Sequence, residues 1–161
     1  MPITTRSASL EDIPTLLDMM GEFYAEADYG LDREWAGSSF TALLSEPSRG
    51  MVLIALADGA PAGYVVVTFR HSMEFGGTDA FIDDLFVRPR YRRRGIGKVA
   101  LTAAFEACGE RGALAVHVET SEGNPPAVAL YGSLGMLDRQ RLLLTKKLTS
   151  RTELPLAGMR P

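Results

Sequence analysis

The segment that most restricts the fold of this chain is a basic turn with two glycines at residues 92–98. An apolar run at 79–87 precedes it, and a helical pattern at 95–110 follows it. Because the first N–H groups of a helix have no intrahelical partner and the helix dipole is positive there, a phosphate can bind at such a junction. Gly95 and Gly97 lack side chains, so an anion can approach the backbone closely. The segment therefore predicts an anion-binding turn between a strand and a helix.

Two familiar phosphate-binding motifs do not match this turn. A nucleotide triphosphate P-loop would need glycine at Arg92 and Ser or Thr at Val99. A dinucleotide-binding fingerprint would need a third glycine besides Gly95 and Gly97, and a different order of strands. A basic run can also be no more than a solvated face, an alternative that the turn by itself leaves open.

Hydrophobic periodicity predicts a chain of the α/β class, or α+β under a stricter naming. We expect strands at 2–7, 51–57, 63–69, 79–87, 114–120 and 137–148, and helices at about 10–24, 32–46, 95–110 and 125–134. Ser9 or Asp12 could cap the first helix, and a turn at Asp58 makes a hairpin of the second and third strands. We expect a loop at 71–78. The strand-helix-strand unit at 79–120 should be parallel, with a right-handed crossover, so the sheet is mixed.

The length of 161 residues predicts one domain, which we place at 1–148, followed by a tail at 149–161. The net charge of −3 gives no general attraction to nucleic acid or to anionic membranes. No apolar run approaches the ~18 residues of a membrane span. Cys108 is the only cysteine, which excludes an intramolecular disulfide and a cysteine zinc site, and no other metal constellation is evident. Residues Met1–Arg6 do not resemble a signal peptide, so we expect a reducing, cytoplasmic compartment.

Two motifs in this chain resemble the signatures of the GNAT acyltransferase superfamily. The first is the strand Ile82–Pro89 with its Val-x-Pro ending, followed by the pattern R-x-x-G-x-G at 92–97. The second is Asn124–Tyr131, which matches N-x-x-A-x-x-L-Y and is followed by a Leu-Gly pair. The two motifs occur in the family's order within a matching strand-helix-strand-helix pattern, and the resemblance covers roughly residues 2–148.

The resemblance implies a mixed, mostly antiparallel sheet in which a central parallel pair, 80–87 and 114–120, splays apart and is flanked by helices. It implies an enzyme that transfers an acetyl group from acetyl-CoA to a primary amine of a small molecule, a peptide N-terminus or a lysine. The amine would attack directly in a ternary complex, with acetyl-CoA in the gap between the two strands and without a metal. The residues implied in cofactor binding are Leu85, Phe86, Val87, Arg92, Arg93, Arg94, Gly95, Ile96, Gly97, Lys98, Asn124 and Tyr131.

Three residues are implied in the chemistry: Asp83, Asp84 and Tyr131. An alkylamine arrives protonated at neutral pH, so a carboxylate, or a water held by one, must accept its proton. Neighbouring residues of a strand point to opposite faces, so we expect only one of Asp83 and Asp84 to face the cleft, and we favour Asp83 as the base or amine-binding group. Glu119, at the end of the next strand, is an alternative base. Tyr131 is the expected acid for the departing CoA thiolate, and its alternative role is to pack the last helix on the sheet.

The acceptor site is expected in the first two helices, their connection and the 70–79 loop. Acids and aromatics suit a cationic amine, although surface helices are commonly acidic. A non-catalytic, CoA-binding regulatory module of the same fold is the alternative function, and nucleic-acid binding is disfavoured by the net charge. By analogy with relatives, the last strand could form a homodimer interface. We read His71 and His117 as structural or loop residues. The acids and aromatics of the expected acceptor site are Glu22, Glu26, Asp28, Asp32, Glu34, Glu74, Tyr24, Tyr29, Trp35 and Phe75.

Overall fold

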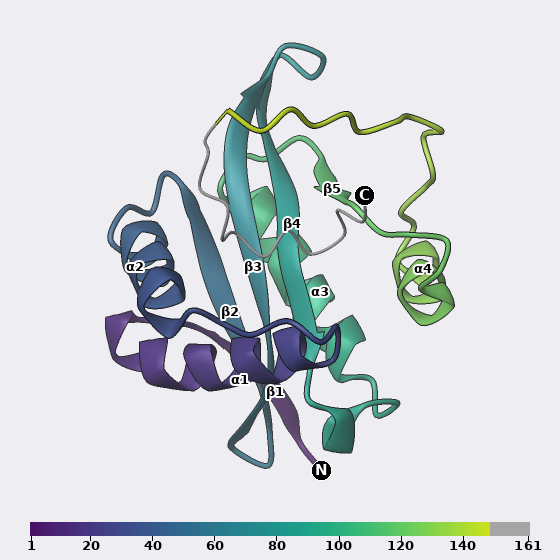
Figure 1. Ribbon diagram of the computed structural model, residues 1–161. Helices are drawn as coiled ribbons and strands as arrows, with labels where there is room; N and C mark the ends of the chain where they lie inside the picture. The colour runs from purple at the N-terminus through teal and green to yellow at the C-terminus, as the bar shows by residue number, and fades with distance from the viewer. Residues whose placement is uncertain (149–161) are drawn as a thin grey trace.

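The computed structural model describes residues 1–148, which form five strands and four α-helices (Figure 1). The strands are β1 (Ile3–Ser7), β2 (Gly50–Ala57), β3 (Ala60–Ser72), β4 (Gly77–Val87) and β5 (Val116–Val118). The helices are α1 (Ile13–Ala25), α2 (Arg33–Leu44), α3 (Ile96–Glu110) and α4 (Pro125–Ser133). The tail predicted at 149–161 lies outside the described residues.

The strands make one mixed sheet in the order β1-β2-β3-β4-β5. Strands β1 to β4 are antiparallel to their neighbours, and β5 runs parallel to β4 after the crossover through α3. The predicted α/β architecture, a mixed and mostly antiparallel sheet with one parallel pair, is confirmed. Among the described residues the parallel pair lies at the edge of the sheet rather than at its centre.

Helices cover both faces of the sheet and make two separate cores (Figure 1). Helices α1 and α2 lie on one face, with Leu16, Met19 and Phe40 among their fully or nearly buried residues. Helix α3 covers the other face, where Ile96 and Leu101 are buried. Strands β2 and β3 supply residues to both cores, which explains why they read as nearly continuous apolar runs.

The helix starts follow from side-chain caps. One of the two proposed caps is used: the Ser9 N–H donates to Asp12 Oδ2 at 2.8 Å across a short 3-10 turn. Asp12 occupies the cap position of α1 but makes no side-chain hydrogen bond into that helix. Pro14 occupies the first turn of α1, where a missing N–H costs nothing. The Asp32 carboxylate accepts a hydrogen bond from the Trp35 N–H at 3.0 Å and so fixes the start of α2.

Two predicted segments are corrected. The strand predicted at 137–148 is wrong: the segment has no regular structure and exposes most of its leucines. A strand needs a neighbour for its N–H and C=O groups, and no described strand pairs with this segment; instead Arg139 and Arg141 contact Glu74 in the β3–β4 turn at 2.6 and 3.1 Å. The loop predicted at 71–78 is shorter, because β3 extends to Ser72 and β4 begins at Gly77.

Candidate active site

A β-bulge in β4 decides where Asp83 and Asp84 point. Two consecutive residues of β3 pair with Ile82 and Asp84, so β4 has one extra residue at this position. Ile82 and Leu85 both pack on the α3 side of the sheet, which places the two residues between them on the α1–α2 side. The expectation that Asp83 and Asp84 face opposite ways is therefore wrong, because the bulge interrupts the alternation of side chains along the strand.

The surroundings of Asp84 make its charge costly. The carboxyl group lies beside the fully buried Tyr64, whose hydroxyl donates a hydrogen bond to Asp84 Oδ2 at 3.3 Å. Burial and, to a lesser extent, the charge of Asp83 raise the pKa of Asp84 to about 6, while the hydrogen bond from Tyr64 acts in the opposite direction. Burial and both carboxylates also raise the pKa of Tyr24 on α1. A carboxyl group of this kind changes its charge close to neutral pH.

Both aspartates line a cavity of about 380 Å³ between the sheet and the first two helices. This volume lies within the range of small-ligand sites. Tyr24 and Trp35, which the sequence suggested, are part of its wall, whereas Arg49 and Thr68 were not foreseen. No local sequence pattern indicates Arg49 and Thr68, because only the pairing of β2 with β3 brings them to the cavity. The lining comprises Met20, Tyr24, Trp35, Ala36, Ser39, Phe40, Ala42, Leu43, Arg49, Val66, Thr68, Asp83 and Asp84.

Strands β4 and β5 separate beside the bulge. They pair at only three positions, from Ala80↔Val116 to Ile82↔Val118, whereas β4 continues along β3 as far as Val87. The edge of β4 at residues 83–87 therefore has no β5 partner, so the predicted splay is present. An extended ligand with amide groups can bond to such an open edge in the manner of a strand.

The basic turn has the backbone geometry expected of an anion site. Arg93 and Gly95 have φ values of 60° and 82°, in the left-handed region. The first hydrogen bond into α3 runs from the Val99 N–H to the Gly95 carbonyl at 3.0 Å. Within residues 1–148, the N–H groups of residues 93–98 donate to no backbone carbonyl. Turns of this type form concave clusters of N–H donors that suit phosphate groups.

The arginine side chains of this region are used largely within the protein. Arg92 donates to the Val87 carbonyl at 2.8 Å and pairs with Glu26, the residue directly after α1. Arg88 pairs with Glu22 of α1 at 2.9 Å. These two arginines therefore attach α1 to the end of β4, and the backbone rather than their side chains remains available for an anion.

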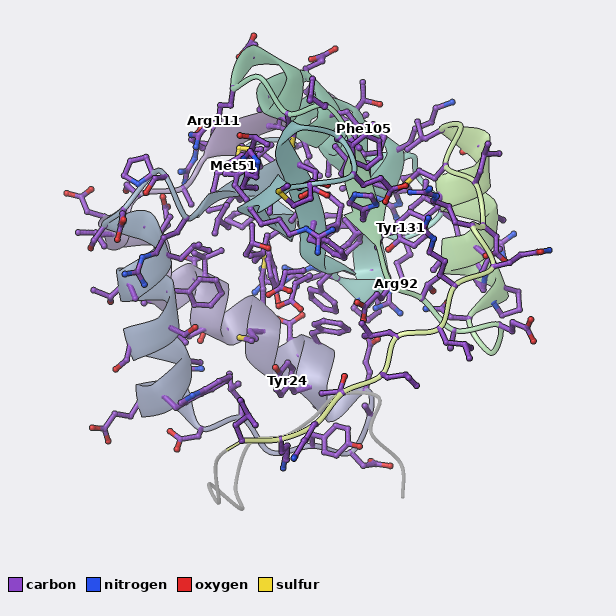
Figure 2. The ribbon with its side chains drawn as sticks, turned by 90° about the horizontal axis from the view of Figure 1, so that it is seen from above. Tyr24, Met51, Arg92, Phe105, Arg111 and Tyr131 are labelled. Atoms are coloured by element: carbon purple, nitrogen blue, oxygen red, sulfur yellow. The ribbon has the colours of Figure 1, made fainter. Side chains whose placement is uncertain are left out.

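Tyr131 of α4 lies on the α3 side of the sheet. Tyr131 is 9% exposed, and Figure 2 shows it between α4 and the sheet, away from Tyr24 of α1. The hydroxyl group bonds to no described residue but is not sealed from solvent. Burial raises the pKa of Tyr131, so the phenol stays protonated at neutral pH. Helix α4 approaches α3 closely, since a Cβ on Gly97 would lie 3.1 Å from Leu130 Cδ2.

Comparison with known proteins decides the family. Residues 13–136 match the model of the Acetyltransferase (GNAT) family, which is most of the chain. The chain belongs to the GNAT acetyltransferase family. It is an enzyme of the acetyl-CoA-dependent N-acetyltransferase type, and the resemblance on the two sequence motifs is confirmed.

The names of proteins similar to this GNAT protein refer to different acceptors or to none. A Bacillus subtilis (strain 168) protein, provisionally named a ribosomal protein bS18-alanine N-acetyltransferase, is 28% identical over 131 residues, 81% of this chain and 78% of that protein. A solved integron cassette protein from the mobile metagenome of Cole Harbour Salt Marsh is 36% identical, with a TM-score of 0.83 over 90% of each chain. The aminoglycoside N-acetyltransferase AAC(6')-Iy, solved in complex with CoA, has a TM-score of 0.79 over 92% and 96% of the chains; at 19% identity it shows the fold alone.

Other predicted residues of the GNAT protein have evident structural roles. The Asn124 side chain caps α4 by accepting from the Ala127 N–H at 3.4 Å. Glu119 is exposed just beyond β5. His117 has a partner that the sequence did not reveal: its Nε2 lies 2.8 Å from Asp79 Oδ2.

The acids expected around the acceptor do not gather in the cavity. Glu22 and Glu26 pair with arginines, Asp32 caps α2, and Glu74 contacts the segment after α4. Within residues 1–148, no cluster of His, Cys, Asp and Glu could hold a metal ion. No helix in the same range is long and apolar enough to cross a membrane.

Proposed function

We propose that this enzyme acetylates a primary amine by direct attack on acetyl-CoA in a ternary complex, with Asp84 as the base. The observation that supports this function is the bulge in β4, which turns two carboxylates toward one cavity beside the splayed strands. The cavity would receive the amine, and the splay would receive the thioester. Asp83, which is exposed, would bind the ammonium group before Asp84 takes its proton.

The residues around the splay fit the parts of acetyl-CoA. The unpaired edge of β4 around Leu85 and Phe86 offers N–H and C=O groups to the pantetheine arm. The N–H groups of residues 93–98 would hold the pyrophosphate, with added positive charge from Arg93 and Lys98. Asn124, at the start of α4, would lie near the cofactor arm through the part of its amide that does not cap the helix.

The proposed reaction forms one bond and breaks another without a covalent enzyme intermediate. An ammonium group loses its proton to Asp84, and the free amine nitrogen forms a bond to the acetyl carbonyl carbon. A backbone N–H near the bulge stabilises the negative oxygen of the tetrahedral intermediate. The carbon–sulfur bond then breaks, and the Tyr131 hydroxyl protonates the leaving thiolate. The nitrogen loses its second proton to solvent water, which gives the neutral amide, and the Tyr131 phenolate takes a proton back from water. Asp84, with a pKa of about 6, is ionised at neutral pH and still basic enough to accept a proton.

The proposed base and the proposed acid lie on opposite faces of the sheet. Asp84 faces the α1–α2 side, and Tyr131 belongs to the α3 side. In the tetrahedral intermediate the amine enters and the sulfur leaves in different directions, so a base and an acid on opposite sides of the splay match the two proton transfers. This division supports the assignment of Tyr131 as the acid.

Steady-state rates of the purified enzyme across pH 5 to 9 test the proposal. We expect kcat/KM to fall below about pH 6 as Asp84 becomes protonated. Asp84→Asn should lower kcat at pH 7.5 by about 10²-fold and remove this acid limb. Tyr131→Phe should lower kcat by about tenfold, a smaller effect because a thiolate is a good leaving group.

Glu119→Gln is the matched control for the base. An intact rate in Asp84→Asn together with a large loss in Glu119→Gln would transfer the base role to Glu119. Tight binding of CoA without turnover of any amine would instead favour the non-catalytic regulatory module.

A further inference from the structure

We propose that the acceptor of this enzyme is a compact monoamine with an apolar body, and that the cavity discriminates against diamines and polyamines. The inference rests on the proposed function, because it takes the cavity beside Asp83 and Asp84 as the acceptor site. It is carried by the distribution of charge and apolar surface over the cavity wall.

One end of the cavity recognises a cation, and most of the rest is apolar. Asp83 and Asp84 are the only acids of its wall within residues 1–148. Opposite the sheet, the two helices contribute aromatic rings and aliphatic side chains, over which an alkyl or aryl group loses water favourably. The apolar and aromatic wall is formed by Met20, Tyr24, Trp35, Phe40, Leu43 and Val66.

The acids of α1 and of the residue that follows it pair with arginines, and none of them lies in the cavity wall. On α1, Asp18 pairs with Arg33 at 2.9 Å and Glu22 pairs with Arg88 at 2.9 Å. Glu26, directly after α1, pairs with Arg92. The acidic appearance of the first two helices in the sequence therefore does not create an acidic cavity, and a polycation finds one anionic point rather than several.

Arg49 adds a cation to the cavity wall. It follows the turn after α2 and lies next to β2, whereas Asp83 and Asp84 lie on β4, two strands away. Its Nε donates to Glu46 at 2.6 Å, but Glu46 is not part of the wall. A substrate whose first amine reaches the carboxylates would place a second ammonium group on apolar surface or near this guanidinium. Both positions are unfavourable for a charge.

Hexylamine and hexamethylenediamine test the inference, because they share one carbon chain and differ by a single terminal ammonium group. Release of CoA thiol from acetyl-CoA gives kcat/KM for each amine with the purified full chain. We expect hexylamine to exceed the diamine by about tenfold or more. Arg49→Gln should raise kcat/KM for the diamine and so lower the ratio of kcat/KM between hexylamine and the diamine. Trp35→Ala should lower kcat/KM for hexylamine by about tenfold.

Arg90→Gln is the control, since Arg90 is exposed, stacks on Tyr91 and lies outside the cavity wall, and it should leave the ratio unchanged. A diamine that equals or exceeds hexylamine would overturn the inference while leaving the proposed function intact. If neither amine is acetylated, the proposed function fails for alkylamines. Calorimetric titration of both amines into the CoA complex then decides the preference of the cavity, and equal or stronger binding of the diamine overturns it.

Discussion

Asp84 is a residue for which stability and the proposed activity have opposite requirements. Its carboxyl group lies against buried Tyr64 and next to a second carboxylate, so ionisation is disfavoured in the folded protein. In the unfolded chain the same group ionises near the ordinary pKa of 3.8. The folded protein therefore holds this proton more tightly, and stability falls as pH rises from about 4 through about 6. If stability were the only requirement, replacing Asp84 with a neutral residue would raise the free energy of unfolding.

Asp84→Asn should stabilise the protein at neutral pH. An amide keeps the shape of the side chain and its acceptor oxygen for Tyr64, but has no charge to desolvate. We expect a gain of roughly 1–3 kcal/mol at pH 7, disappearing near pH 4, where the wild-type group is protonated too. Thermal melts of both proteins across this pH range measure the gain; a constant difference at every pH would show that the charge of Asp84 is not its source.

At the scale of elements, the start of β4 is attached to its neighbours by a buried acid. Asp79 is fully buried and accepts hydrogen bonds from Arg70 of β3 at 2.8 and 3.0 Å. Its other contact is His117 of β5, so one carboxylate joins three strands. β5 pairs with β4 over three residues only, which makes this side-chain contact a substantial part of its attachment. The bond from Arg70, followed by that from His117, lowers the pKa of Asp79.

Asp79→Asn should lower Tm at pH 7 by several degrees, because it leaves Arg70 and His117 without their anion. The stabilisation by Asp79 is present above the ordinary carboxyl pKa and is lost as pH falls through its lowered folded value, so the difference should shrink in strong acid. Asp18→Asn, which breaks an exposed pair with Arg33, is the comparison and should change Tm little. Equal effects of the two variants would mean that Asp79 contributes no more than a surface pair.

At the scale of the whole molecule, the sheet separates two faces, and β4 and β5 part at its edge. The cavity lined by Asp83 and Asp84 lies on the α1–α2 face, and the Tyr131 side chain on the α3 face. The basic turn adjoins the end of β4 and is attached to α1 through Arg88 and Arg92. A ligand that spans the turn and the splay would therefore contact several elements at once and stabilise the folded state.

Acetyl-CoA and CoA should each raise Tm, whereas ATP at the same concentration should not, because it lacks the pantetheine arm that fits the edge of β4. Lys98→Glu should reduce the rise by placing a negative charge at the start of α3. Lys147→Glu, an exposed lysine after α4, is the matched control and should retain it. A comparable rise with ATP, or no rise with acetyl-CoA, would contradict the assignment of the turn and the splay.

The sequence by itself determined the features that depend on local pattern. Helix α3 with its glycine turn, the β2–β3 hairpin and the parallel β4–β5 pair were all predicted, because periodicity and turn chemistry act over a few residues. The two family motifs likewise identified the enzyme class. The strand predicted at 137–148 failed, because apolar residues favour a strand only where another strand offers hydrogen bonds.

Only the tertiary structure decided which side chains meet. A bulge that no local pattern announced turned Asp83 and Asp84 to one face, and strand pairing brought Arg49 to the same cavity. Arginines distant in sequence neutralised Glu22 and Glu26, so the acidic helices did not produce an acidic site. The physical reason is that a sequence pattern indicates the backbone preference and burial of one element. The pKa of a carboxyl group, its desolvation and the partners within its distance depend on contacts between elements.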